Sequence, residues 1–217
     1  NVKCTPHNSK CINGTRFVPI EAIDVAGLVP DAFKGRGLGN KFLDDLRQAH
    51  ALIHIVDSSG STDAEGNPCG IGKYDPINDV DFLEKEINYW LMGIIKKDLE
   101  SVARRCEVEG KKIEPILAEK LTGLGIKEEH INSAIKALGL DRDKPSKWTD
   151  DELLKFSDYT RKTSKPMLIA FNKCDIASDE FIAKSEGLIK NDYIVVPTSA
   201  ESELALTNAA KKDLIYY

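Results

Sequence analysis

Short apolar runs, separated by segments of helix length, constrain the fold of this 217-residue chain more than any other feature. Three of these runs are almost wholly apolar, are of strand length and stop at a polar residue or a proline; they span residues 51–56, 166–171 and 193–196. Strands that are buried on both faces of a sheet are apolar at successive positions, and parallel sheets are covered by helices. The runs therefore predict an α/β fold with three layers around a mostly parallel sheet.

A further apolar run covers residues 17–25 and stops at Gly27. Its β-branched and aromatic residues favour a strand, so we expect another strand of the same sheet here. Helical spacing of apolar residues follows from residue 38 to residue 49. This alternation of strand and helix patterns is what a parallel sheet with crossover helices requires.

A long helical segment separates two of the predicted strands. Roughly 110 residues lie between the run that ends at Val56 and the run that begins at Pro166, although a crossover needs only a loop and one helix. Near the end of this segment, Thr149 is followed three residues later by Glu152, which is the signature of a helix capping box. The predicted parts are the first half of an α/β domain, a helical insertion and the second half of the α/β domain, at residues 1–90, 91–150 and 151–217.

Composition and charge exclude several classes of protein. Hydrophobic residues make up 41% of the chain and charged residues 30%, which is typical of a globular protein and not of a disordered one. The net charge of -5 disfavours nucleic-acid binding through a basic surface, and sequence-specific DNA binding with it. No apolar run approaches the ~20 residues of a membrane helix, so we expect no membrane partner. The five scattered cysteines favour a reducing cytoplasm over a disulfide scaffold.

Cys4, His7 and Cys11 form a small cluster of soft ligands in a segment rich in Pro, Asn and Ser. Their short spacing is compatible with a zinc site, in which Cys69 or a water would be the fourth ligand. The same spacing is compatible with the tip of a hairpin that carries free thiols. The sequence leaves both interpretations open.

The strand ends carry the residues of chemical interest, because ligands of open parallel sheets bind at the carboxyl ends of the strands. Asp24 and Gly27 form an Asp-x-x-Gly segment at the first of these ends. The Asp24 carboxylate could hold Mg²⁺ through a water, and the Gly27 amide could reach a terminal phosphate because glycine has no side chain. The alternative is an ordinary turn after a strand.

The run that ends at Phe171 is followed by Asn172, Lys173, Cys174 and Asp175. Guanine presents two adjacent N–H donors on one edge, which a carboxylate such as Asp175 can accept and which adenine lacks. Asn172 would hold the loop and the Lys173 stem would cover the face of the base. The alternative is a polar loop that caps a helix, since Asn and Asp are common caps.

Small residues follow the last predicted strand, at Thr198, Ser199 and Ala200. They would let the Ala200 amide approach an oxygen of a bound base. A helix cap before Glu201 is the alternative for these residues taken alone. The order of the three segments along the chain favours a nucleotide site over three unrelated caps.

These segments resemble the third, fourth and fifth motifs of the translation-factor-related P-loop GTPases, and residues 24–42 are similar to the glycine-rich switch II of the Obg group. The long helical segment after Trp90 resembles the insertion of the YchF subfamily, in particular its archaeal branch. The resemblance implies a Ras-like G domain with a helical, coiled-coil-like insertion and a small C-terminal TGS domain. It also implies a GTPase that uses magnesium and associates with ribosomes or ribosomal RNA.

The chain departs from the family pattern in two respects. It contains no G-x-x-x-x-G-K-[ST] segment, so residues 1–217 alone should bind GTP weakly and not hydrolyse it, and we expect a longer parent protein. Many relatives that prefer ATP have Asn-Met-x-Glu at the base-recognition motif, whereas Lys173 and Asp175 favour GTP here. A degenerate nucleotide- or ribosome-binding module that does not hydrolyse GTP is the alternative if the chain is complete.

The water-activating group is not identified by the sequence. Leu28 occupies the position where Ras-like enzymes have a glutamine, and a leucine cannot orient a water. The remaining candidates are a potassium ion, a backbone group or the ribosome. His54 lies inside an apolar strand pattern, which favours a structural role.

Overall fold

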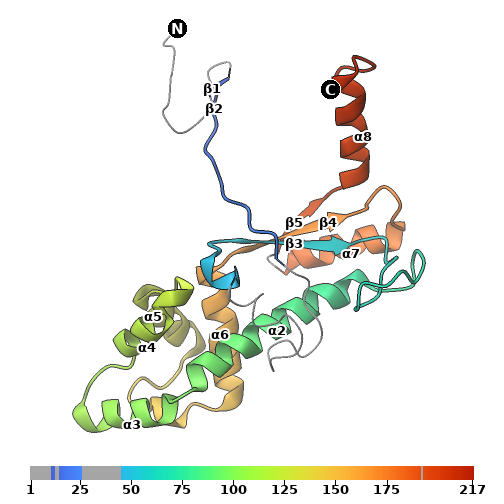
Figure 1. Ribbon diagram of the computed structural model, residues 1–217. Coiled ribbons are helices and arrows are strands. Elements are labelled where there is room, and N and C mark those ends of the chain that lie inside the picture. Colours follow the sequence, from blue (N-terminus) through green and yellow to red (C-terminus); the bar gives the residue numbers. More distant parts are fainter. Residues whose placement is uncertain (1–10, 13–14, 26–44, 192) are drawn as a thin grey trace.

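The computed structural model describes residues 11–12, 15–25, 45–191 and 193–217 (Figure 1). Its main sheet is parallel and has the strand order β3 (Leu52–Asp57), β4 (Met167–Asn172) and β5 (Ile194–Pro197). The register pairs Val56 with Phe171, and Phe171 in turn with Pro197. The three apolar runs thus form the three strands of one parallel sheet, which confirms the predicted α/β class.

One face of this sheet is covered by the helices α2 (Pro76–Lys96) and α7 (Asp179–Lys190). Its core consists of buried residues from two of the strands and from both helices: Val56, Val80, Ile169, Phe171 and Leu188. Burial of these side chains provides most of the stability of a packing interface of this kind, at roughly 25 cal/mol per Å² of apolar surface.

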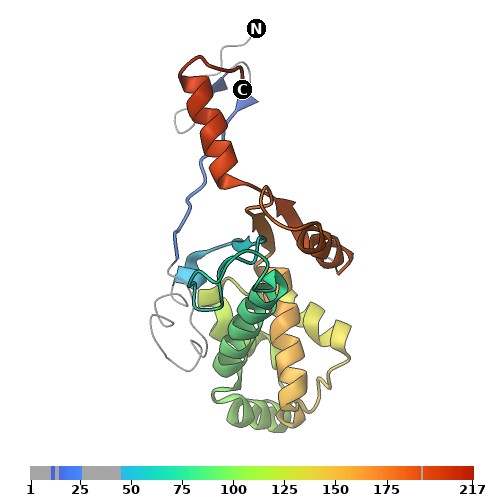
Figure 2. The same ribbon diagram turned by 90° about the vertical axis from the view of Figure 1, so that its right-hand side faces the viewer.

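The opposite face of the sheet is exposed in the part of the chain that the structure describes. Its outward-facing apolar side chains are Ile53, Ile55, Ile194 and Val196. Helix α8 (Ala200–Lys211) leads away from the sheet and buries none of its residues (Figures 1 and 2). Of the three layers expected from the sequence, the described residues therefore show the sheet and one helical layer.

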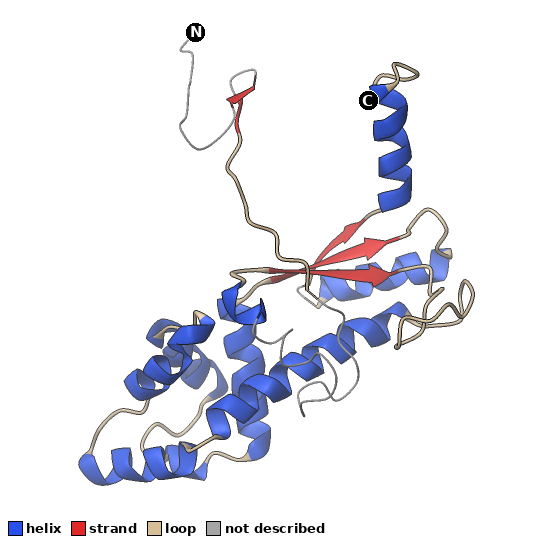
Figure 3. Cartoon of the chain, in the orientation of Figure 1, coloured by secondary structure: helices blue, strands red, loops and turns tan. Residues whose placement is uncertain are grey.

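The remaining helices form a separate helical part with its own core. It contains α3 (Leu99–Glu109), α4 (Glu114–Leu121), α5 (Glu128–Leu138), α6 (Asp150–Ser164), and the short 3-10 turns η2 (Thr122–Leu124) and η3 (Pro145–Lys147) (Figure 3). The second half of α2 contributes Leu91 and Ile95 to this core, while its first half packs on the sheet. The domain boundaries at residues 90 and 150 stay predictions. None of the helices in the described ranges is both long and apolar enough to cross a bilayer.

Helix α6 begins with the predicted capping box. The Glu152 amide donates to Thr149 Oγ1 at 3.3 Å, and the Thr149 amide donates to Glu152 Oε2 at 2.8 Å. Each side chain satisfies a backbone N–H that the first turn of a helix would otherwise leave without a partner.

A buried polar network joins the helical part to the sheet. Arg161 on α6 is almost fully buried and pairs with Glu84 on α2 and with Asp158. The Tyr193 hydroxyl, just before β5, donates to Glu84 Oε2 at 2.6 Å. Burial, followed by the hydrogen bond to Glu84, raises the pKa of Tyr193 well above its usual value. The network holds this phenol in place between the two parts.

The expected strand at residues 17–25 is wrong. These residues have no regular secondary structure, and Phe17, Val18 and Ile20 are exposed. No backbone hydrogen bond links this run to another described residue. β-branched residues favour an extended chain, but a strand exists only where a neighbour pairs with it. Pairing in this region is limited, among the described residues, to a short antiparallel hairpin of β1 (Cys11–Ile12) and β2 (Thr15–Arg16).

Candidate functional site

The candidate site lies at the carboxyl edge of the main sheet, where the loops after β3, β4 and β5 meet. Asp57 and Asn172 are partners in the register of β3 and β4, so both loops start at the same level of the sheet. Ser58 donates to the Asn172 carbonyl oxygen from its amide at 2.8 Å and from its hydroxyl at 2.6 Å. The Cys174 amide donates to the Thr198 carbonyl at 3.1 Å. The three loops are therefore joined to one another by hydrogen bonds.

Asn172 connects the second loop to the third through its side chain. Its Oδ1 accepts the Ala200 amide at 3.0 Å and the Thr198 hydroxyl at 3.4 Å. An amide side chain in this place holds both loops in register, as the interpretation of Asn172 requires. The Ala200 amide, which we expected to face a bound base, is engaged by Asn172, so a base oxygen would share that donor.

Ser199 acts as the N-cap of α8. Its hydroxyl accepts the Ser202 amide at 3.3 Å, as in the helix-cap alternative considered for this segment. Its side chain is therefore committed to the helix, and its contribution to a ligand site would come from its backbone. Asp175 is exposed at the same edge, so its carboxylate is accessible to a ligand.

Lys173 has a left-handed backbone conformation, with φ of 63°, and its side chain reaches back toward β3. Its Nζ lies 2.8 Å from Asp57 Oδ2 and 3.0 Å from Ser61 Oγ. A lysine is rarely found at positive φ, because its Cβ crowds the backbone there. The ion pair with Asp57 ties the loop after β4 to the end of the neighbouring strand.

Asp57 was missed by the interpretation of the sequence. Its Oδ1 accepts from the amide and the hydroxyl of Ser59, and its Oδ2 accepts from the hydroxyls of Ser61 and Thr62 as well as from Lys173. Burial alone would raise the pKa of Asp57, but the hydrogen bonds from Lys173 and the hydroxyls outweigh it and hold the pKa well below its usual range. An acidic residue at a strand end, followed by a Ser/Thr-rich loop, was the available signal.

The backbone conformation at Gly60 fixes the path of the loop after Asp57. This glycine has φ of 59°, and a Cβ at this position would collide with the Tyr74 carbonyl oxygen and the Phe181 ring. The Gly60 carbonyl accepts the amides of Lys73 and Tyr74 at 3.2 and 3.1 Å. Because no other residue fits this backbone and this space, the hydroxyls that surround Asp57 have defined positions.

The structure does not bring Asp24 to this edge through a strand. Asp24 is exposed in an irregular segment, which contradicts the argument that it ends a strand beside Asn172. The strand was inferred from residue types, and the pairing that would position it is absent among the described residues. Gly27 lies outside the described residues, as do Leu28, Cys4 and His7. No cluster of three or more potential metal ligands occurs in the described part of the chain.

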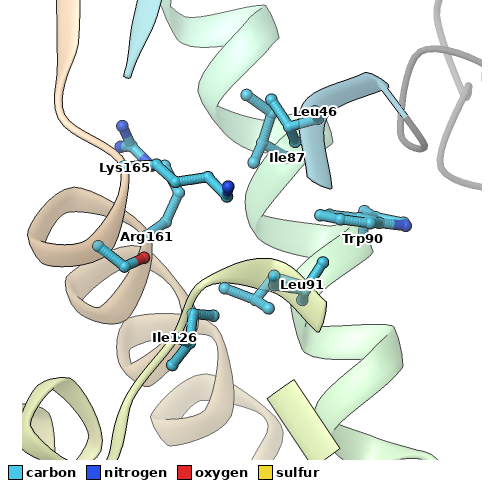
Figure 4. A pocket seen from close by; sticks show the side chains of 9 residues that line it. Leu46, Ile87, Trp90, Leu91, Ile126, Arg161 and Lys165 are labelled. Carbon is cyan, nitrogen blue, oxygen red and sulfur yellow. The ribbon is translucent and has the colours of Figure 1, made fainter. Parts of the chain in front are cut away.

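A hollow away from this edge lies between α2 and α6, in the helical part (Figure 4). Its lining is mainly apolar and includes Leu46, Ile87, Trp90, Leu91 and Ile126. Lys165 borders it and donates to the carbonyl oxygens of Arg47 and Ala49 at 3.4 and 2.6 Å. Burial lowers the pKa of Lys165. Because this amine is already engaged, the hollow resembles a packing gap more than a ligand site.

His54 on β3 has the structural surroundings that its sequence context favours. Its Nδ1 is buried and has no hydrogen-bond partner among the described residues. Burial lowers the pKa of His54 to about 4, against a smaller opposing effect of the Glu84 charge. The imidazole is therefore neutral at neutral pH.

Comparisons with known proteins converge on one group. Residues 170–217 match a family model described as "Obg-like GTPase YGR210-like, G4 motif-containing domain". The chain is 52% identical over 216 residues to an uncharacterized GTP-binding protein of Methanocaldococcus jannaschii, covering 99% of this chain and 53% of that protein. It is 29% identical over 220 residues to the ribosome-binding ATPase YchF of Bacillus subtilis, covering 95% of this chain and 56% of that one.

A solved structure has the same fold. The crystal structure of a GTP-binding protein from Pyrococcus horikoshii OT3 matches all of this chain and 58% of its own, with a TM-score of 0.82 and 41% identity. The chain thus spans about half the length of the curated relatives it matches.

Proposed function

We propose a GTP-binding function for this chain, which belongs to the Obg-like family of GTP-binding proteins with a P-loop GTPase fold. The observation that carries the proposal is the joining of the three loops at the carboxyl edge of β3, β4 and β5. Asn172 holds the loop after β5 through Ala200 and Thr198, which leaves the Asp175 carboxylate exposed beside it. An edge of this kind is where open α/β sheets bind ligands.

Each residue has a distinct role in this proposal. Asp175 accepts the two N–H donors of guanine, and the Lys173 stem lies against the face of the base. Asn172 sets the distance between the loop after β4 and the loop after β5. Thr198, Ser199 and Ala200 bring the backbone after β5 close to the base oxygen. Adenine lacks the donor pair that Asp175 would accept, so the site favours GTP and GDP over ATP and ADP.

Hydrolysis of GTP by the full-length protein is the second part of the proposal. By its resemblance to the family motif, Asp24 would hold a hydrated Mg²⁺ and the Gly27 amide would contact the γ-phosphate, although Asp24 is exposed and does not end a strand at the sheet edge. When bound, magnesium neutralises charge on the phosphates. A potassium ion is a candidate for aligning the attacking water, and we assign that role to no residue.

The names of the relatives support a proposal for the cellular setting. The Bacillus subtilis relative is named a ribosome-binding ATPase, which supports a ribosomal partner for this family member. We place the protein in the cytoplasm for that reason, with ribosomal RNA or protein as its macromolecular partner.

Calorimetry on the full-length protein tests the proposal. GTP and GDP should bind at least about ten-fold more tightly than ATP and ADP, since loss of a charged hydrogen-bond pair costs at least one factor of ten. Equal binding of ATP and GTP contradicts the base assignment. Phosphate release from GTP in the presence of magnesium tests hydrolysis separately. Binding without release, with or without potassium and ribosomes, favours a nucleotide-binding module that is not an enzyme.

A further inference from the structure

We propose that Asp57 is a positioning residue for nucleotide binding, which anchors the Lys173 amine so that the lysine stem forms a preset surface for the guanine base. The inference rests on the proposed GTP-binding function and goes beyond the base-recognition motif. It assigns a role to a residue on a different strand, separated from Lys173 by 116 positions in the chain.

The contacts of Asp57 show that it is an anchor and not a ligand-binding carboxylate. Both of its oxygens accept hydrogen bonds from the protein, from Ser59 on one side and from Ser61, Thr62 and Lys173 on the other. Only 10% of its side chain is exposed. A carboxylate with its acceptor positions used and its surface covered has little capacity left for a metal ion or a proton.

Lys173, unlike Asp57, has a side chain that is partly exposed to solvent. Its side chain is 40% exposed, although its amine is bound at 2.8 Å by Asp57 and at 3.0 Å by Ser61. Most of a lysine side chain is a methylene stem, which is apolar and suits the face of a base. Asp57 and Ser61 hold the amine, while part of the side chain remains accessible to a ligand.

Anchoring has a direct effect on affinity. A free lysine side chain loses much of its rotamer entropy when a ligand fixes it, and that loss opposes binding. Asp57 restricts those rotamers before the nucleotide arrives, so this cost does not oppose binding. The ion pair therefore acts on nucleotide binding through the placement of the Lys173 side chain.

The loop that carries the hydroxyl groups is rigid enough to support this role. Gly60 seats its backbone against Tyr74 and Phe181, and the Ser59 carbonyl accepts the Gly72 amide at 2.8 Å. Ser58 in turn bonds the carbonyl of the residue that precedes Lys173. Both ends of the Asp57–Lys173 pair are therefore fixed to the same framework.

The test uses the full-length protein and a ribose-labelled fluorescent GDP, with inorganic triphosphate as a ligand that lacks the base. Asp57→Asn should weaken GDP by up to about ten-fold, the usual cost of fixing one rotamer-rich side chain on binding, and leave triphosphate unchanged. In a Lys173→Met background, Asp57→Asn should have no further effect on GDP. The matched control is Lys184→Met, which breaks a similar ion pair, Lys184 with Asp75 at 2.7 Å, away from the base loops.

The outcomes separate the inference from the proposed function. Wild-type protein that binds no GDP refutes the proposed function and this inference with it. Wild-type protein that binds GDP, together with an Asp57→Asn protein that binds it equally well, refutes only the positioning role. Equal losses for GDP and triphosphate, or an undiminished effect of Asp57→Asn in the Lys173→Met background, also refute it, because they indicate a general disturbance of the fold.

A conservative variant keeps the test decisive if Asp57→Asn does not fold. Lys173→Arg can still pair with Asp57 and should bind GDP within about three-fold of the wild type, whereas Lys173→Met should lose about ten-fold. An equal loss for Lys173→Arg and Lys173→Met would show that the charge pairing is irrelevant and overturn the inference.

Discussion

The side-chain oxygen of Asn172 accepts the Ala200 amide at 3.0 Å, so the end of β4 is bonded directly to the first turn of α8. One amide group thereby sets the separation of two loops that are far apart in the sequence. We expect the affinity of the proposed nucleotide site to depend on this contact.

Asn172→Ala should therefore weaken nucleotide binding more than it weakens the fold. Loss of the side-chain acceptor leaves the Ala200 amide without a partner in the protein, which costs about 1 kcal/mol of stability. GTP affinity should fall by more than ten-fold, because both loops lose their relative position. Calorimetry and thermal melting measure the two effects. Asn132→Ala, which changes a partly exposed asparagine on α5, is the control and should leave GTP affinity unchanged.

Asp175→Asn should change the choice of base. The amide places a donor opposite the N–H groups of guanine, so GTP binding should weaken by about 1–3 kcal/mol. Xanthine nucleotides, which carry an oxygen in place of the guanine amine, should bind more tightly than they do to the wild type. Competition binding with GTP and XTP measures the change, and Asp179→Asn on α7 serves as control. A variant that loses both nucleotides equally would contradict base recognition by Asp175.

Gly60→Ala should destabilise the protein by more than about 2 kcal/mol, on the order expected for a left-handed alanine plus steric overlap. The overlap arises because the new Cβ meets the Tyr74 carbonyl oxygen and the Phe181 ring. Gly66→Ala is a matched control, since Gly66 also has positive φ but an added methyl group there would meet no described atom within 4 Å. The free energy of unfolding of Gly66→Ala, measured with denaturant, should fall by only about 1 kcal/mol. Similar losses for both variants would show that backbone conformation alone decides the effect.

Stability should fall between pH 6.5 and about pH 4, because burial lowers the pKa of His54 to about 4. In this window the unfolded chain binds a proton that the folded protein excludes, so the free energy of unfolding rises with pH. The contribution of this one group is about 3 kcal/mol at most, fully present above the unfolded pKa. His54→Leu should flatten the profile in this window, while the exposed His50→Gln should retain it. An unchanged slope in His54→Leu would assign the dependence to other groups.

Local patterns predicted much of the architecture. The apolar runs correspond to β3, β4 and β5. They could be predicted because length and continuous hydrophobicity are properties of each segment alone. The capping box of Thr149 and Glu152 was predictable for the same reason, since its partners are three residues apart. The run at residues 17–25 had equally suitable residue types, yet it is not a strand because pairing depends on a neighbour.

The fold class, the positions of the strands in the main sheet and the polar residues that follow them could all be read from the order of residues, since they depend on local hydrophobicity. Which of those polar residues meet could not be read in this way. Asp57 and Lys173 are 116 positions apart, and no periodicity connects them. Their contact follows from the parallel pairing of β3 with β4, which brings two strand ends to one edge, and from the tight loop at Gly60 that directs the surrounding hydroxyls toward the carboxylate.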